Sequence, residues 1–127
     1  MIIDFHTHVF PPQIKKNRSK YVGDDPCFAI IYSDPKAKLA TADELITSMD
    51  EDGVDISVLV NHGWTTHELC VETNDYILES IARYPNRLIG FCSVQPNSYE
   101  AAIAEIERCA KGGARGVGEM RPDMQLF

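Results

Sequence analysis

The sequence predicts an α/β fold in which four parallel strands alternate with helices. Short apolar runs of strand length recur four times along the 127 residues, and segments with helical hydrophobic periodicity separate them. Strands that are joined by crossover helices pair in parallel, with right-handed connections. Apolar residues make up 44% of the chain and charged residues 24%, which is typical of a globular domain. We therefore expect residues 1–127 to form one domain.

The first expected strand is followed by a long irregular segment. Residues 1–9 begin with an apolar run that leads into two histidines, and we expect a strand there. Residues 10–40 show no clear period and are interrupted by proline and glycine. This composition predicts a long loop, with room for a short helix, and long loops in compact domains are usually functional or mobile.

The first long helix and the second strand have clear sequence signals. Thr41 and Glu44 form a capping box, which predicts that a helix starts here, and Gly53 predicts its end. Residues 55–61 are nearly all apolar, as expected for a strand that is buried on both faces. The segment therefore predicts a helix followed by a central strand.

The second half of the chain repeats the unit of helix and strand. Its helices are indicated by apolar residues at helical spacing, and its strands by short apolar runs. The expected elements are a helix over 66–84, a strand over 88–94, a helix over 97–111 and a strand over 114–119. No covering helix is expected after the fourth strand.

Two architectures fit this order of elements. One is a small open doubly wound sheet of the flavodoxin type, and the other is the first half of a (β/α)8 TIM barrel. A complete barrel needs about 250 residues, so 127 residues would supply only its first four strands. Either arrangement leaves unpaired sheet edges, through which a homo-oligomer could form.

Charge and cysteine content exclude several classes of function. Twelve basic residues stand against nineteen acidic ones, and the net charge of −7 argues against nucleic acid or an anionic membrane surface as a partner. No apolar run approaches the length of a membrane span, and the first residues do not resemble a signal peptide. We expect free thiols in a reducing, cytoplasmic environment, because no C-x-x-C pair occurs among Cys27, Cys70, Cys92 and Cys109.

A candidate metal site lies at the end of the first strand. Asp4, His6 and His8 alternate, so their side chains should share one face of the strand. Two neutral imidazoles suit zinc, or manganese, iron or cobalt. Glu119 ends the fourth strand, at the same edge of a parallel sheet, where its carboxylate is a candidate third ligand or a bridge between two metal ions. The alternatives are two ordinary polar residues at a strand end and a solvated glutamate.

Further residues at this edge are candidates for substrate contact. His62 follows the second strand, and Arg121 follows Glu119, where a guanidinium could hold a substrate carboxylate through two hydrogen bonds. An ordinary loop histidine and a surface charge are the alternatives. Trp64 either lines the mouth of a pocket or packs over the rim of the sheet. Asp4 is interpreted either as a support for the metal ligands or as a structural hydrogen-bond acceptor.

Several motifs together resemble the amidohydrolase superfamily, specifically its amidohydrolase-related branch that includes aminocarboxymuconate semialdehyde decarboxylase-like enzymes. The resemblance covers essentially the whole chain. The first motif is the most specific, and the others support it in combination. These segments are Asp-Phe-His-Thr-His-Val-Phe-Pro at 4–11, Asp-Gly-Val-Asp at 52–55, Asn-Asp-Tyr at 74–76, Pro-Asn-Arg-Leu-Ile-Gly-Phe at 85–91 and Gly-Ala-Arg-Gly-Val-Gly-Glu at 113–119.

This resemblance implies the N-terminal half of a metal-dependent hydrolase on a (β/α)8 barrel, acting on a small-molecule substrate. It implies that His6, His8 and Glu119 are metal ligands, with zinc as the first expectation and manganese or iron as alternatives. The implied reaction is attack by metal-activated water on an amide, ester or related bond. A non-oxidative decarboxylase remains an alternative, as do a non-catalytic half-barrel that associates with itself and an open binding domain with an accidental His-x-His. Further ligands of the family come from strands five, six and eight, which these 127 residues do not include.

Overall fold

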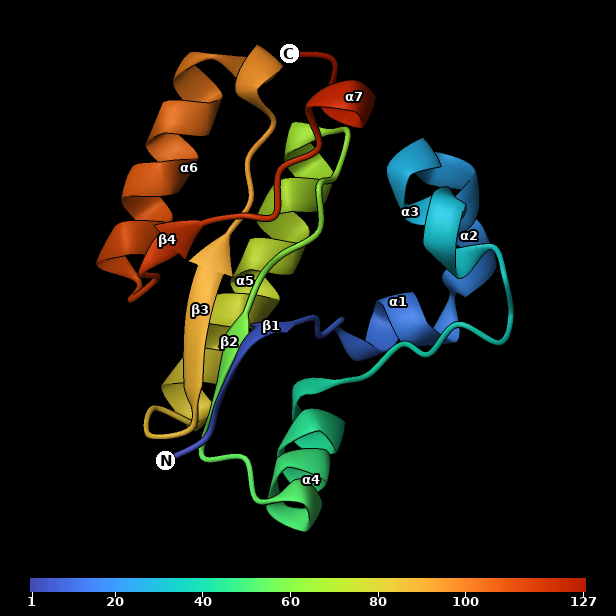
Figure 1. Cartoon of the computed structure of the whole chain (residues 1–127). Helices are drawn as coiled ribbons and strands as arrows, with labels where there is room; N and C mark the ends of the chain where they lie inside the picture. Colours follow the sequence, from blue (N-terminus) through green and yellow to red (C-terminus); the bar gives the residue numbers. More distant parts are fainter.

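A computed structural model of the chain describes residues 1–127 and shows an α/β fold with four parallel strands (Figure 1). The elements are β1 (Ile3–Thr7), α1 (Pro12–Lys16), α2 (Arg18–Asp24), α3 (Pro26–Tyr32), α4 (Ala42–Asp52), β2 (Ile56–Leu59), α5 (His67–Arg83), β3 (Leu88–Cys92), a 3-10 turn (Pro96–Ser98), α6 (Glu100–Lys111), β4 (Gly116–Val117) and α7 (Pro122–Gln125). No helix combines the length and the apolar character needed to cross a membrane.

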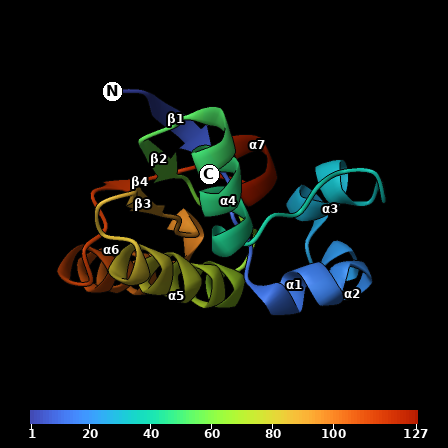
Figure 2. The same ribbon diagram turned by 90° about the horizontal axis from the view of Figure 1, so that it is seen from below.

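The strands lie in the order β1-β2-β3-β4, and each pair is parallel. A flavodoxin-type sheet has the order 2-1-3-4, so the sequential order corrects that alternative and matches the first four strands of a (β/α)8 barrel. Helices α5 and α6 lie side by side over one face of the sheet (Figures 1 and 2). Parallel pairing places the carboxyl ends of all four strands at one rim.

The long helices begin and end as their sequence signals predict. The Thr41 hydroxyl accepts a hydrogen bond from the Glu44 amide and caps α4, and Gly53 ends that helix with a left-handed φ of 72°. Helix α5 is capped in the same way by Thr66. Beneath α4 and α5, a cluster of Val9, Ala42, Met49, Leu59, Ile81 and Leu88 forms the core on this face of the sheet.

The expected long loop over 10–40 is largely helical, which corrects the prediction. Helices α1, α2 and α3 have only five to seven residues each, too short to produce a recognisable hydrophobic period. Proline occupies the first turn of α1 and of α3, where it favours the start of a helix. Buried side chains of these three helices form a second core cluster together with Phe10, Leu39, Trp64 and Cys70. The helices contribute Ile14, Tyr21, Phe28 and Tyr32.

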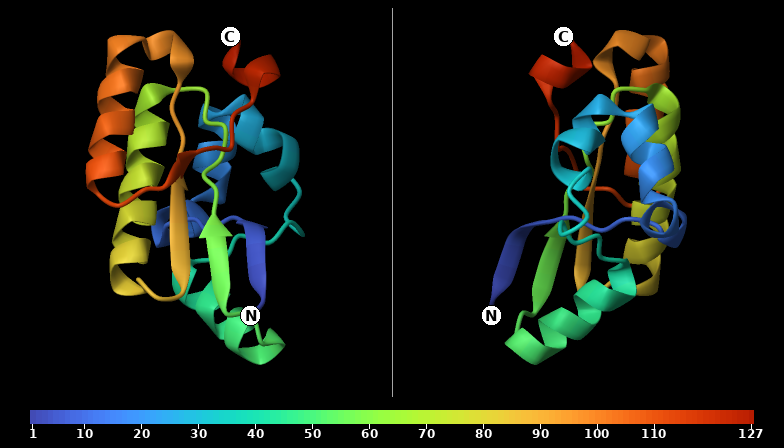
Figure 3. Two further views of the ribbon diagram at one scale, coloured as in Figure 1. Left: turned by 60° about the vertical axis from the view of Figure 1, so that its left-hand side comes forward. Right: turned by 90° about the vertical axis from the view of Figure 1, so that its right-hand side faces the viewer.

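Two boundaries and one additional short helix also differ from the prediction. The fourth strand is restricted to Gly116–Val117 within the expected 114–119, and α6 starts at Glu100 because a 3-10 turn occupies Pro96–Ser98. A short helix, α7, follows the fourth strand where none was expected. The two chain ends lie at opposite ends of the molecule (Figure 3), with the C-terminal segment on the side of the rim.

Candidate metal centre

The first strand delivers two imidazoles to the rim of the sheet. The register of β1 against β2 shifts between Asp4 and Thr7, which is the position of a bulge. Bulges commonly re-aim side chains next to functional sites. His6 lies within this irregularity and His8 directly after it, and their side chains are 64% and 27% exposed. Asp4 accepts a hydrogen bond from the His6 amide at 3.2 Å, so it acts as a local structural acceptor.

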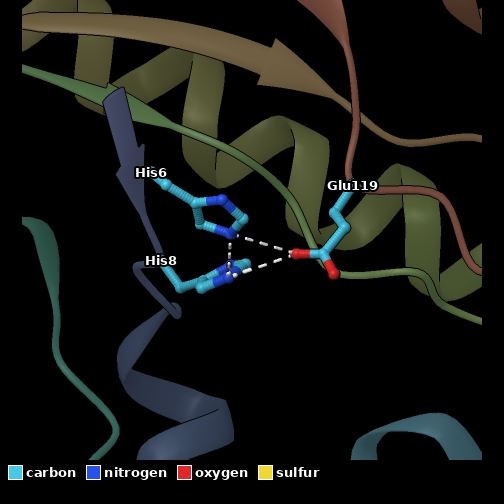
Figure 4. A group of neighbouring side chains, drawn as sticks. All are labelled: His6, His8 and Glu119. Atoms are coloured by element: carbon cyan, nitrogen blue, oxygen red, sulfur yellow. Dashed lines mark hydrogen bonds and ion pairs between the residues drawn. The ribbon is translucent and has the colours of Figure 1, made fainter. Parts of the chain in front are cut away.

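Glu119 completes a triangle of ligand atoms with these two histidines (Figure 4). The Glu119 Oε2 atom lies 3.2 Å from His6 Nε2 and 3.4 Å from His8 Nε2, and the two nitrogens are 3.2 Å apart. Ligand atoms about 2.0–2.2 Å from one ion, at angles between octahedral and tetrahedral, are about 2.8–3.6 Å apart. The triangle therefore has the dimensions of one face of a metal coordination sphere.

The backbone of β2 sets the chemical state of His8. The His8 Nδ1 atom lies 3.0 Å from the Val60 carbonyl oxygen, to which it can only donate. This contact leaves the Nε2 lone pair free to face Glu119 and bind a cation. Burial lowers the pKa of His8, against the opposing charge of Glu119, and so favours the neutral imidazole that a metal ion requires.

Asn61, the residue after Val60, holds Glu119 in place through its main chain. The Asn61 amide donates to the Gly118 carbonyl at 2.9 Å, and the Glu119 amide donates to the Asn61 carbonyl at 2.7 Å. The Ser93 hydroxyl adds a contact to the Glu119 carbonyl at 3.3 Å. The end of β2 therefore holds both the first-strand and the fourth-strand ligands through main-chain contacts.

The side chain of Asn61 organises the loop that follows. Its Oδ1 accepts from the His62 amide at 2.7 Å and from Trp64 Nε1 at 3.1 Å. Its Nδ2 donates to Thr73 Oγ1 at 2.8 Å and to Asn74 Oδ1 at 2.7 Å. All four contacts are buried, so Asn61 ties the loop after β2 to helix α5.

The structure places His62 inside the protein, next to Asn61, whose main chain pairs with that of Glu119. Its side chain is only 6% exposed and is surrounded by the rings of Phe10, Phe28, Tyr32 and Trp64. The Nε2 atom is buried without a hydrogen-bond partner. Burial lowers the pKa of His62, and the nearby His8 adds to that effect, while Asp25 opposes it.

Arg121 lies over the same loop. A Cβ atom at Gly63 would stand 2.7 Å from the Arg121 Cγ, so glycine permits this close packing. The guanidinium pairs with both carboxylate oxygens of Asp123, at 3.0 and 2.8 Å. Arg121 is therefore at the rim, two residues from Glu119, and its guanidinium forms an ion pair with Asp123.

Sequence reasoning missed the contribution of helix α3 to this rim. Asp25, Phe28 and Tyr32 come from the segment that was expected to be a loop, and no motif marked them. Trp64 is fully buried and stacks on Phe28 with ring centroids 5.2 Å apart, so it packs beneath the rim and does not line a pocket mouth. All four cysteines are free and buried, in agreement with the expectation.

The model of the family described as Amidohydrolase matches residues 3–125. The gamma-resorcylate decarboxylase of a Polaromonas species is 28% identical over 78 residues, which cover 54% of this chain and 24% of the relative. The chain thus spans about a quarter of this curated relative.

Two solved structures share the fold. A 5-carboxyvanillate decarboxylase from Novosphingobium aromaticivorans, with bound manganese, has a TM-score of 0.73 and 21% identity, over 92% of this chain and 41% of that one. A dihydroxybenzoic acid decarboxylase from a Polaromonas species, with bound manganese and the inhibitor 2-nitroresorcinol, has a TM-score of 0.60 and 26% identity, over 91% and 37% of the two chains. The chain spans about two fifths of either structure.

Proposed function

Because the chain belongs to the amidohydrolase family, we propose that it supplies the first four strands and three metal ligands of a metal-dependent, non-oxidative decarboxylase. The proposed ligands are His6, His8 and Glu119, and the proposed substrates are small hydroxylated aromatic acids. The observation that carries the proposal is the triangle of ligand atoms, with sides of 3.2, 3.2 and 3.4 Å. The decarboxylase relatives named above support the choice of reaction.

We propose manganese as the cation, with zinc or iron as alternatives that the ligand set also accepts. The two relatives with bound manganese support this choice. Two imidazoles and one carboxylate occupy three positions and leave the others open to a substrate. A divalent cation there would draw negative charge onto the substrate oxygens that it binds, and so would favour an acid over a neutral molecule.

The residues of the chain have separate tasks in this proposal. His8, fixed by the Val60 carbonyl, and Glu119, fixed by the Asn61 main chain, hold the cation at a defined point. Arg121 is proposed to bind the leaving carboxylate, in exchange for part of its pairing with Asp123. Loss of carbon dioxide breaks the bond between the ring and the carboxyl carbon, and the ring carbon then takes up one proton.

Hydrolysis is the second candidate function. The observation that favours it is the ligand set itself, because two histidines and one glutamate with an open position are also the donors of hydrolytic zinc sites. In that case the cation would lower the pKa of a bound water molecule toward neutrality. The proposed substrates would then be amides, esters or related bonds.

An assay of both reactions on one preparation separates the two candidates. The manganese-loaded chain, combined with the remaining four strands of the barrel, is incubated with gamma-resorcylate, and separately with a panel of aryl amides and esters, and both carbon dioxide and cleaved product are measured. We expect carbon dioxide release that falls at least a hundredfold in Glu119→Gln, with Glu107→Gln on the surface of α6 as the matched control. Cleavage of amides or esters without carbon dioxide release would replace the decarboxylase proposal with hydrolysis.

A further inference from the structure

Two neighbouring side chains, Tyr32 and His62, each carry a polar atom that makes no hydrogen bond within the chain. Tyr32 is the last residue of α3, and its side chain is 7% exposed, yet its hydroxyl makes no hydrogen bond within the chain. His62 lies beside it, with ring centroids 6.2 Å apart, and its Nε2 is buried without a partner. Most buried polar groups in folded proteins are paired, so the unused nitrogen of His62 requires an explanation. The Tyr32 hydroxyl beside it is free to bind a ligand.

The ring of Tyr32 is held in a fixed position. It stacks on Phe28 with centroids 4.6 Å apart and meets the edge of Phe10 at 5.1 Å. Such packing restricts the rotation of the ring and keeps the phenol oxygen at one point. A fixed polar group contributes more to ligand binding than a mobile one, because less entropy is lost when the ligand arrives.

Helix α3 is tied to the loop that follows His62. The carboxylate of Asp25 is fully buried and accepts hydrogen bonds from the Phe28 amide at 2.9 Å and from the amide and hydroxyl of Thr65, both at 2.8 Å. Three charge-assisted hydrogen bonds make this a strong attachment. The attachment explains how a helix from a distant part of the sequence is held at the rim.

Tyr32 is also within electrostatic reach of the metal triangle. His62 follows Asn61, whose main chain pairs with that of Glu119. Burial raises the pKa of Tyr32, and the negative charge of Glu119 raises it further. The phenol therefore stays protonated at neutral pH and acts as a hydrogen-bond donor toward an acceptor at the rim.

We propose that the Tyr32 hydroxyl is a substrate-binding group, which donates a hydrogen bond to an anionic oxygen of an aromatic acid held at His6, His8 and Glu119. The inference rests on the proposed function, because it needs a cation at that triangle to anchor the acid. It adds a residue from α3, an element that none of the sequence motifs marked. It also assigns the hydroxylated aromatic acid an orientation, with one anionic oxygen turned toward α3.

The test compares Tyr32→Phe with Tyr21→Phe. Each change removes one hydroxyl from a buried ring of the same segment, but the Tyr21 hydroxyl donates to Glu72 at 2.7 Å and not to the rim. Each manganese-loaded protein is titrated with 2-nitroresorcinol, whose absorbance reports binding, and manganese affinity and the midpoint of thermal unfolding are measured in parallel. We expect Tyr32→Phe to weaken binding of the probe about tenfold, with manganese affinity and the midpoint unchanged, and Tyr21→Phe to leave binding of the probe unchanged.

Three results would overturn the inference, and they differ from one another. Equal probe affinity in Tyr32→Phe and the unsubstituted protein would show that the hydroxyl does not touch the ligand. A loss of probe binding that is accompanied by a lower midpoint or weaker manganese binding would assign the hydroxyl a structural role. Failure of the unsubstituted protein to bind the probe would overturn the inference alone if manganese still binds, and the proposed function as well if it does not.

Discussion

Two consecutive residues directly after β2, Val60 and Asn61, hold two of the three candidate ligands in place. The Val60 carbonyl accepts from His8, and the Asn61 main chain pairs with Glu119. The sequence predicts that His6, His8 and Glu119 meet, because alternation on a strand and parallel pairing put them at one rim. It does not predict the roles of Val60 and Asn61, because those roles depend on main-chain atoms that every residue carries.

The buried imidazole of His62 should make the stability of the metal-free chain depend on pH. Its pKa is lowered in the folded state, so below about pH 6.5 the unfolded chain binds a proton that the folded chain does not. The free energy of unfolding should therefore fall as the pH decreases from about 6.5, and His8, whose pKa is also lowered, acts in the same direction. Above that range, both imidazoles are neutral in both states and the effect vanishes.

Urea unfolding at several pH values in the presence of EDTA measures this dependence. His62→Phe should make the curve below pH 6.5 shallower, by at most about 1.4 kcal/mol per pH unit, which is the contribution of one proton. The pH dependence that remains in His62→Phe comes from His8 and the other titrating groups. An identical slope in His62→Phe and the unsubstituted chain would contradict the account of His62 as a buried, neutral imidazole.

Among the elements, the short helices between β1 and α4 were the hardest to predict. Each is only five to seven residues long, and helices of that length are held by tertiary contacts more than by their own propensity. By contrast, α4 and α5 have capping residues and enough turns to show a period, and their predicted boundaries agree with the structure within one residue. Helix α3 was therefore missed for a physical reason, although it brings Tyr32 to the rim.

The attachment of α3 through Asp25 gives a prediction at the scale of this element. Asp25→Ala removes the cap of α3 and two part-buried hydrogen bonds from Thr65, and we expect it to lower the free energy of unfolding by about 2–4 kcal/mol. The adjacent Asp24→Ala is the matched control, because Asp24 is exposed and pairs only with Lys20. Its effect should stay within about 0.5 kcal/mol.

Denaturant unfolding of the two variants, with fluorescence of the single Trp64 as the probe, tests this attachment. Trp64 stacks on Phe28 of α3, so its emission reports directly on the packing of that helix. A loss in Asp25→Ala no greater than that in Asp24→Ala would show that the buried carboxylate does not anchor α3.

At the scale of the whole molecule, the sheet has two free edges and one face without helices. Ile3 and Phe5 of the edge strand β1 are 49% and 66% exposed, although Phe5 meets Phe91 edge to face. The sequence predicts the alternation of strands and helices and the parallel pairing of the strands, because crossover helices of sufficient length impose that pairing. It left open whether the sheet was doubly wound or barrel-like, since that choice depends on which strands become neighbours in space.

The central claim is that His6, His8 and Glu119 together hold a divalent cation. The most direct measurement is the manganese content of the dialysed chain, determined by elemental analysis and by electron paramagnetic resonance. We predict about one equivalent in the unsubstituted protein and in the control His67→Ala, and a loss of at least a hundredfold in affinity in His6→Ala/His8→Ala. Manganese retained equally by the double variant would contradict the claim.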